Sequence, residues 1–334
     1  MAFWDELRGL ALNIEDFGTE RKSVDVSTQF TRVTTTVVLG GEGEQGRGED
    51  VTYTGEDHDW FPDLAPPGRT TLGELSAQLD GLRLFEAEPK MGASADYRRW
   101  AFESAALDLA LRQNDLSLGA AVGREYRPLR FVVSTRGDAF AWLQHNPRLE
   151  LKLDPENDWD RPFMERLAAT GRVRVLDFKA YYTGTPVDVV PDPVLYRAAV
   201  ELFPDAVLED ASLDGECGAA LQGQEARLSF DAPIHSVADV RALPVEPGWV
   251  NIKPSRFGTI ERLLECIEHC AGNGIQMYGG GQFELGVGRR HIQVLASLFY
   301  PEGPNDVAPR EYNLGEPRPG LPQSPLPPPE EVGF

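Results

Sequence analysis

The sequence predicts a parallel α/β barrel preceded by a smaller α+β domain. From Leu129 onward, short β-branched and apolar runs alternate with amphipathic segments, as is typical of strand–helix units around a parallel sheet. Several of these runs end in an ionisable residue, and these residues recur about 22 to 32 positions apart, roughly one strand plus one helix. The chain has 334 residues, which is enough for both domains.

Residues 1–125 are predicted to form the α+β domain. The Thr- and Val-rich segment 27–39 predicts a strand, and the glycine-rich segment 40–50 predicts a turn or flexible loop. The following EDVTYTG predicts a second strand. A helical stretch is expected within 71–89, and 95–115 predicts a strong helix with a large apolar surface.

Residues 126–310 are predicted to form the barrel. Strands are expected near 130–134, 149–153, 173–178, 206–210, 227–231, 249–253 and 275–279. Helices are expected at 161–170, 193–203, 236–243, 257–272 and 288–299, with an eighth element after the last of them. The remaining residues, 311–334, form a Pro-rich tail that we expect to pack back on the smaller domain.

Composition argues against several classes of function. A net charge of −21 is a poor match for nucleic acid, because phosphate binding needs clustered cations. No apolar run reaches the roughly 18 residues of a membrane span, and the first residues lack the basic start and apolar core of a secretory signal. Three cysteines make a disulfide framework a poor interpretation, so we expect a cytoplasmic protein.

Five ionisable residues close or nearly close successive predicted strands. They are Lys152, Asp177, Glu209, Asp231 and Lys253. In a barrel of parallel strands such residues meet at the C-terminal mouth. Three carboxylates from successive strands are hard oxygen ligands that suit Mg²⁺, with Mn²⁺ as a substitute, whereas the lack of His and Cys disfavours zinc. A single acid at a strand end often caps a helix, but three in succession indicate a metal site.

Two lysines flank the three acids. Lys152 precedes them by one strand and Lys253 follows them by one, so the two should face each other across the mouth. A lysine whose pKa is lowered by burial and nearby cations can act as a base, and a metal can stabilise the enolate that forms. Lys179 lies two residues after Asp177, should point to the same face of its strand, and is a further candidate cation.

The order and spacing of these residues resemble the enolase superfamily, in particular its muconate lactonizing enzyme subgroup. The matching segments are LELKL around Lys152, VRVLDFK around Asp177, VLEDA around Glu209, LSFDAPIHSVADV around Asp231 and VNIKPSRFG around Lys253. The stretch GGGQFELGVGRR (279–290) is similar to the family's seventh-strand segment, with Glu284 as its acidic residue. The resemblance spans nearly the whole chain and implies a modified TIM barrel, (β/α)7β, with an N-terminal α+β capping domain.

The resemblance also implies roles for the site residues. Asp177, Glu209 and Asp231 would hold Mg²⁺, Lys152 would be the leading base, and Lys253 would be the opposite acid/base or an enolate-stabilising cation. The chain departs from the family where the second-strand lysine pair reads ELK, which removes the cation that normally lowers the pKa of the base. The third-strand Asp-x-Asn reads DFK, so Lys179 could compensate.

A rival register makes DFK the second-strand motif and Lys179 the base. It leaves only about 30 residues for two further strands before Glu209, and it leaves Lys152 unused, so the spacing disfavours it. Glu56 and His58 are candidates for substrate contact from the capping domain, as Glu284 is from the barrel. The glycine-rich segment 40–50 is expected to be a mobile loop of that domain.

The expected function is Mg²⁺-dependent removal of a proton α to a carboxylate of a small molecule. The outcome would be cycloisomerisation or a syn-dehydration of the o-succinylbenzoate-synthase type. Amino-acid or dipeptide epimerisation is an alternative, although PNDVAP (304–309) lacks the Asp-x-Asp with which dipeptide epimerases hold the substrate amine. Another alternative is a catalytically impaired barrel acting as a binding protein. A homo-oligomer is compatible with the sequence.

Overall fold

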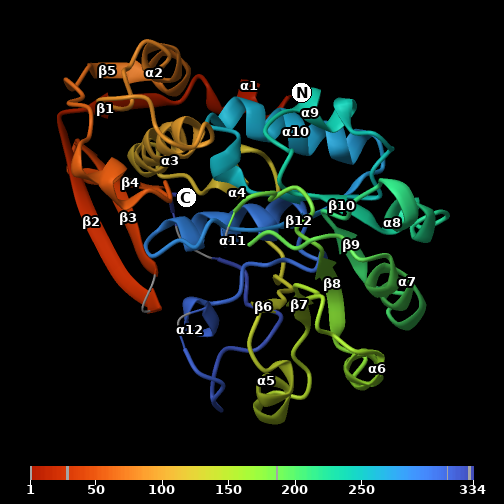
Figure 1. Ribbon diagram of the computed structural model, residues 1–334. Coiled ribbons are helices and arrows are strands. Elements are labelled where there is room, and N and C mark those ends of the chain that lie inside the picture. Colours follow the sequence, from red (N-terminus) through yellow and green to blue (C-terminus); the bar gives the residue numbers. More distant parts are fainter. Residues whose placement is uncertain (1, 28–29, 186, 314, 330–331) are drawn as a thin grey trace.

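The computed structural model describes residues 2–27, 30–185, 187–313, 315–329 and 332–334. A seven-stranded parallel sheet curls into a barrel with helices outside it, and an antiparallel domain built from the N-terminal part of the chain lies against one side (Figure 1). This arrangement is the predicted fold class, a modified barrel with a capping domain.

In the part of the chain that the structure describes, the capping domain contains two antiparallel sheets and three helices. One sheet pairs β1 (Ala11–Ile14) with β5 (Gly68–Thr71), and the other has the order β2 (Asp16–Ser27), β3 (Phe30–Gly41) and β4 (Glu44–Asp50). The helices are α1 (Phe3–Leu7), α2 (Leu72–Leu79) and α3 (Ser94–Gln113), with a 3₁₀ turn η1 (Gly55–Asp59). Thr71 and Glu74 form a capping box at the start of α2, which satisfies backbone donors that the first helical turn leaves free.

The glycine-rich segment 40–50 is a tight hairpin and not the predicted mobile loop. Its glycines let strand β4 approach helix α3 closely, because a Cβ on Gly46 would stand 2.2 Å from the carbonyl oxygen of Ala105. A Cβ on Gly48 would stand 2.0 Å from that of Ala101. The prediction was wrong because glycine here serves close packing of two backbones rather than freedom of the chain.

The strand predicted at EDVTYTG is also wrong, because β4 ends at Asp50. The sequence did not predict β2, whose residues DFGTERKSVDVS show little apolar alternation. That pattern is physically reasonable for an edge strand, since β2 pairs only with β3 in its sheet.

The barrel strands follow one another in sequence order and are all parallel. They are β6 (Val133–Thr135), β7 (Leu151–Leu153), β8 (Val173–Asp177), β9 (Val207–Glu209), β10 (Leu228–Phe230), β11 (Trp249–Ile252) and β12 (Gln276–Gly279). The helices around and beyond them are α4 (Leu118–Ala121), α5 (Ala139–His145), α6 (Arg161–Ala169), α7 (Pro193–Leu202), α8 (Gly215–Ala220), α9 (Val237–Ala242), α10 (Ile260–Gly272), α11 (Gly288–Phe299) and α12 (Arg310–Asn313). Short 3₁₀ turns are η2 (Glu225–Arg227) and η3 (Pro254–Arg256).

The predicted eighth element is an irregular extended segment that joins the two edges of the sheet. The backbone N–H of Asp306 donates to the carbonyl oxygen of Gly279 in β12, at 2.8 Å. The N–H of Val132, next to β6, donates to the carbonyl oxygen of Asn305, also at 2.8 Å. These bonds close the ring, so the ends of all eight elements surround one mouth.

The end of the chain lies on helix α3. The backbone N–H of Phe334 donates to Asp108 Oδ1 at 2.9 Å, and its ring stacks on that of His291 with centroids 4.2 Å apart. The ring of Trp100 meets it edge-on at 6.2 Å. The C-terminal residue therefore joins α3 of the cap to α11 of the barrel. Among the described residues, no helix has the length and apolar character needed to span a lipid bilayer.

Candidate active site

The barrel brings the five ionisable strand-end residues together at its mouth. Lys152 lies in β7, Asp177 and Glu209 end β8 and β9, and Asp231 and Lys253 directly follow β10 and β11. Asp177 and Glu209 are direct partners in the register of their two strands. All five side chains are buried, so the strong interactions that follow operate with little screening by water.

Glu209 stands at the centre of this cluster. Nζ of Lys152 lies 2.7 and 2.6 Å from its two carboxylate oxygens and 3.1 Å from Asp177 Oδ2. Asn251 Nδ2 donates to the same carboxylate at 3.0 Å, and the Tyr278 hydroxyl donates at 2.7 Å. The two polar neighbours were not predicted, because a single Asn or Tyr inside an apolar strand carries no distinctive spacing.

Lys179 points to the same side as Asp177, as its two-residue spacing predicts. Its backbone is in the left-handed region, with φ of 57°, and its ammonium donates to Asp177 Oδ2. Lys152 approaches the same oxygen atom at 3.1 Å. Two ammonium groups therefore converge on one carboxylate oxygen.

Asp231 is held by a separate set of donors. Lys253 Nζ lies 2.8 Å from its Oδ2, the Tyr182 hydroxyl donates to Oδ2 at 2.9 Å, and Arg256 Nη1 lies 3.1 Å from Oδ1. Arg256 and Tyr182 were not predicted from the sequence. Arg256 had a weak signal in the SRFG that follows Lys253, where η3 folds the guanidinium back over the strand end.

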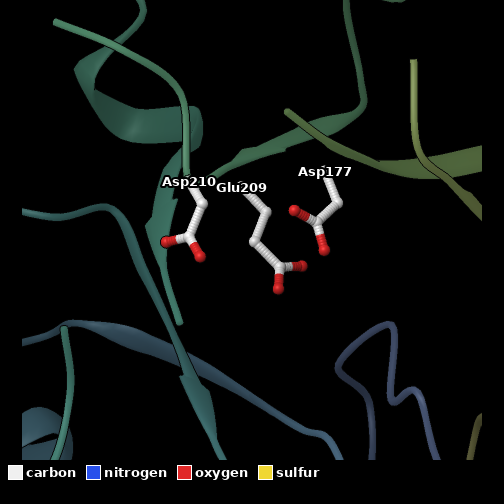
Figure 2. A group of neighbouring side chains, drawn as sticks. All are labelled: Asp177, Glu209 and Asp210. Atoms are coloured by element: carbon white, nitrogen blue, oxygen red, sulfur yellow. The ribbon is translucent and has the colours of Figure 1, made fainter. Parts of the chain in front are cut away.

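Asp210 adds a fourth carboxylate. Its φ is 47°, and its two oxygens accept the backbone N–H groups of Asp231 and Ala232 at 2.8 and 3.0 Å. Oxygens of Asp177, Glu209 and Asp210 lie within 4.8 Å of one another (Figure 2). The structure thus brings two of the three predicted ligands into the tightest acidic group, with Asp231 beside it rather than in it.

The charges of the cluster shift its pKa values strongly. Burial alone would raise the pKa of Asp177, but the ammonium groups of Lys179 and Lys152 outweigh it and hold that pKa at about 2. Burial likewise opposes ionisation of Asp231, yet Arg256 and Lys253 keep its pKa below the usual range. For Lys152, burial lowers the pKa, but the carboxylates of Glu209 and Asp177 raise it well above its ordinary value. Lys152 is therefore an ammonium ion in this state.

The donor set fits a hard divalent cation. Asp177, Glu209 and Asp210 supply converging carboxylate oxygens. Oδ1 of Asp231 is buried, forms an ion pair with Arg256 Nη1 at 3.1 Å and accepts no hydrogen bond from the described residues. Oxygen-only donors suit Mg²⁺ or Mn²⁺. Lys152 and Lys179 now occupy the positions on Glu209 and Asp177 that such a cation would share, so the two lysines and a metal compete for the same oxygens.

A cleft of about 690 Å³ adjoins the cluster through Lys179, which lines it. Val26 and Tyr53 of the cap line it together with residues of the barrel, among them Lys179, Arg289 and Asp306. Of the three lysines at the mouth, Lys179 is the one that lines the cleft among the described residues. The cleft is large enough for a small organic acid and is shaped by both domains.

The lining of the cleft, in the part of the chain that the structure describes, does not include Glu56, His58 or Glu284. His58 is buried in the cap, with its ring nitrogens 2.9 Å from Thr35 Oγ1 and from the carbonyl oxygen of Thr52. Glu56 is exposed on η1. Glu284 Oε1 accepts the backbone N–H of Gln282 at 2.6 Å. Substrate contact by these three residues stays a prediction.

Two buried residues of the cap hold the loop between β12 and α11. Glu49 accepts the backbone N–H groups of Leu285, Gly286 and Gly288 at 2.7 to 2.8 Å. Arg32 donates to the carbonyl oxygens of Gln282 and Phe283 at 2.9 and 3.1 Å. This wall of the cleft therefore depends on the cap for its shape.

Two family descriptions match the chain. "Domain of unknown function (DUF8230) C-terminal domain" matches residues 125–314, and the N-terminal domain of the same name matches residues 5–121. A search of curated proteins found no match.

Solved structures of enolase-superfamily proteins have the same fold. A dipeptide epimerase from Methylococcus capsulatus, solved with Mg and a dipeptide, is 20% identical with a TM-score of 0.66, covering 91% of this chain and 93% of its own. A muconate cycloisomerase variant is 16% identical with a TM-score of 0.61, covering 94% and 92%. An enolase-superfamily protein of unknown role from Enterococcus faecalis V583 is 19% identical with a TM-score of 0.64, covering 90% and 87%.

Proposed function

This chain belongs to the DUF8230 family, and for it we propose a divalent-metal-dependent enzyme that removes a proton α to a carboxylate of a small-molecule substrate. The enolase-superfamily fold and the buried acidic cluster beside a cleft support an enzyme of this kind. The finer assignment rests on one observation, the convergence of Lys152 and Lys179 on Asp177 Oδ2.

In this proposal Asp177, Glu209 and Asp231 hold Mg²⁺, or Mn²⁺ in its place. When bound, the ion supplies positive charge that stabilises the enolate oxygen of the substrate. Asp210 positions the third ligand, because its carboxylate accepts the backbone N–H of Asp231.

Lys152 is the proposed base, and Lys179 replaces the cation missing from the ELK motif. Burial and the positive charge of Lys152 lower the pKa of Lys179, but Asp177 and Asp154 outweigh them and raise it above its usual value, so Lys179 is a cation. Because repulsion between two ammonium groups is mutual, Lys179 also favours loss of the proton from Lys152. The carboxylates of Glu209 and Asp177, which would hold the metal, are the two causes that raise the pKa of Lys152, so the charge of a bound ion would favour the neutral amine of Lys152.

Lys253 stands beyond the acids and completes the pair. Its ammonium donates a hydrogen bond to Asp231, and its strand follows the one that carries this last metal ligand. From this position Lys253 would return a proton to the substrate or stabilise the enolate. With Lys152 as base and Lys253 opposite, the proposed outcome is cycloisomerisation or a syn-dehydration of the o-succinylbenzoate-synthase type.

One observation favours epimerisation as a second candidate. Asp306 lies in the closing segment of the barrel, lines the cleft and stands 3.8 Å from Lys152 Nζ. A carboxylate at this place suits a substrate ammonium group. Asp306 would thus hold the substrate amine, as the Asp-x-Asp does in dipeptide epimerases. An amino acid or dipeptide would then be the substrate, with Lys152 and Lys253 on its two faces.

The test is Mg²⁺-dependent exchange of α-protons for deuterium, followed by NMR over a panel of carboxylates, amino acids and dipeptides. We expect exchange with at least one class, and its loss in Lys152→Met and Lys253→Met. Lys90→Met, which changes an exposed lysine, serves as the matched control. No exchange with any compound, together with no Mg²⁺ binding, would reject the enzyme in favour of a binding protein.

A further inference from the structure

Arg289 is a buried arginine whose hydrogen-bonding capacity is largely unused. It is 7% exposed, its Nε has no hydrogen-bond partner among the described residues, and its Nη2 makes an ion pair with Glu284 Oε2 at 3.3 Å. That carboxylate oxygen also lacks a hydrogen bond within the described chain. A guanidinium has five N–H donors, and leaving them unmet in a buried place costs stability.

The structural arginines of the same protein show the contrast. Arg32, fully buried, donates to four backbone carbonyl oxygens, those of Val51, Thr52, Gln282 and Phe283. Arg98, also fully buried, donates to Asp50 and to three carbonyl oxygens. Neither of them lines the cleft, whereas Arg289 does.

The position of Arg289 suits an anion that enters from the cleft. It is the second residue of α11, and the backbone N–H of Gly288 before it is already taken by Glu49. At this wall the guanidinium of Arg289, whose Nε lacks a hydrogen bond among the described residues, is therefore a group available to an anion. The ion pair with Glu284, at 3.3 Å, orients the Arg289 side chain but leaves N–H donors of the guanidinium for an anion.

We propose that Arg289 binds a second anionic group of the substrate, remote from the carboxylate whose α-proton is removed. The substrate is then a diacid, with a carboxylate or phosphoryl group at the far end. This inference rests on the proposed function for the identity of the first carboxylate. Lys179, whose ammonium is bound to Asp177, and Arg289 line the same cleft of about 690 Å³. One elongated acid in this cleft would have its reacting carboxylate near the acidic cluster and its far anionic group at Arg289.

Arg136 supplies an internal control. It lines the same cleft, but its Nε lies 2.7 Å from Asp154 Oδ2, so its guanidinium is already engaged. Removing Arg136 takes one positive charge from the cleft without removing the under-used donors. The two arginines thus separate specific anion recognition from the general field of the site.

The experiment is calorimetric titration of the full chain, in Mg²⁺, with α,ω-dicarboxylates of increasing length. Each is compared with its monoamide, which has the same shape and a neutral far end, and with a phosphonocarboxylate of equal length. We expect the wild-type protein to bind at least one diacid roughly ten- to a hundredfold more tightly than its monoamide. The phosphonate arm shows whether the far group is a carboxylate or a phosphoryl group.

Four variants decide the result. Arg289→Gln is expected to remove the preference for the diacid, and Arg136→Gln to retain it. Glu284→Gln keeps an acceptor for the Gln282 N–H but removes the competing charge, so it is expected to strengthen diacid binding. Thermal unfolding of each variant confirms that it is folded, and Arg289→Lys, with charge but no fork, is expected to show an intermediate preference.

The inference is overturned by three results: absence of diacid binding to the wild-type protein, equal binding of diacid and monoamide, or a preference that survives Arg289→Gln. Its failure is separable from that of the proposed function. Diacid preference without any α-proton exchange rejects the enzymic chemistry but keeps the anion subsite. Exchange with monoacids alone keeps the chemistry and rejects the subsite.

Discussion

The ammonium of Lys152 lies within 2.7 Å of both carboxylate oxygens of Glu209, and neither side chain is more than 2% exposed. Removing one partner of such a buried pair is destabilising, because the charge of the other partner is left buried without solvation by water. The same pair is also the point at which a metal would enter, so stability and metal binding are coupled through these two residues.

Lys152→Met should destabilise the metal-free protein by about 3–5 kcal/mol, because it leaves the Glu209 carboxylate buried without its cation. Added Mg²⁺ should recover much of that loss, since the ion supplies the missing charge. Urea unfolding with and without Mg²⁺ measures both effects, with exposed Lys90→Met as the control. An equal loss under the two conditions would contradict a metal at Glu209.

Lys179→Asn should tighten Mg²⁺ binding roughly tenfold, because Asp177 loses a competing cation and the incoming ion meets one positive charge fewer. Titration calorimetry measures the affinity, and Arg136→Gln, which removes a cleft cation that contacts Asp154, controls for general charge. The same variant should move the onset of α-proton exchange to higher pH, because Lys152 loses the neighbouring charge that favours its neutral form. Unchanged metal affinity would show that Lys179 does not compete.

Glu49→Gln should destabilise the protein by about 1–3 kcal/mol and slow α-proton exchange, because one amide oxygen cannot accept the three N–H groups now bound to the carboxylate. Urea unfolding and exchange rates follow the two effects. Glu44→Gln, at an exposed position of the same strand, is the matched control. A full rate in the destabilised variant would mean that the loop keeps its shape without the cap.

His291 should make stability depend on pH below neutrality. Burial, with the charges of Arg290 and Arg112, lowers its pKa from 6.5 to about 3. The unfolded chain takes up a proton near pH 6.5 and the folded chain only near pH 3. Folding stability attributable to His291 is therefore complete above 6.5 and falls by about 1.4 kcal/mol for each pH unit toward 3.

His291→Phe retains the stacking on Phe334 and removes the titrating group, so its unfolding free energy should fall less steeply over this range. Urea unfolding at a series of pH values compares it with the wild type and with His145→Phe, which alters an exposed histidine. Parallel curves for all three proteins would remove His291 as the source of the slope.

Much of the barrel could be predicted, because β-branched runs and strand-end charges repeat with the period of a strand and a helix. Lys152, Asp177, Glu209, Asp231 and Lys253 meet at one mouth for that reason alone. The two-residue spacing likewise placed Lys179 on Asp177. These inferences need only local periodicity and the geometry of parallel strands.

Contacts made across long separations could not be predicted in this way. Arg256 and Tyr182 reach Asp231 from different segments. No local pattern marks Tyr182, and Arg256 has only the weak signal of the SRFG segment. Gly46 and Gly48 have the composition of a loop, and only their packing on α3 shows that they belong to a strand. Each of these features depends on which partner the rest of the chain brings near.

The bonds of Arg32 and Glu49 to the loop after β12 connect the two segments that separate family descriptions match. The shape of this loop therefore depends on residues of both segments. A chimaera that paired this barrel with the cap of a relative would inherit a reshaped wall beside Arg289 unless the incoming cap also carried an arginine and a glutamate at these two places. The proposed substrate specificity would then depend on the interface between the two domains.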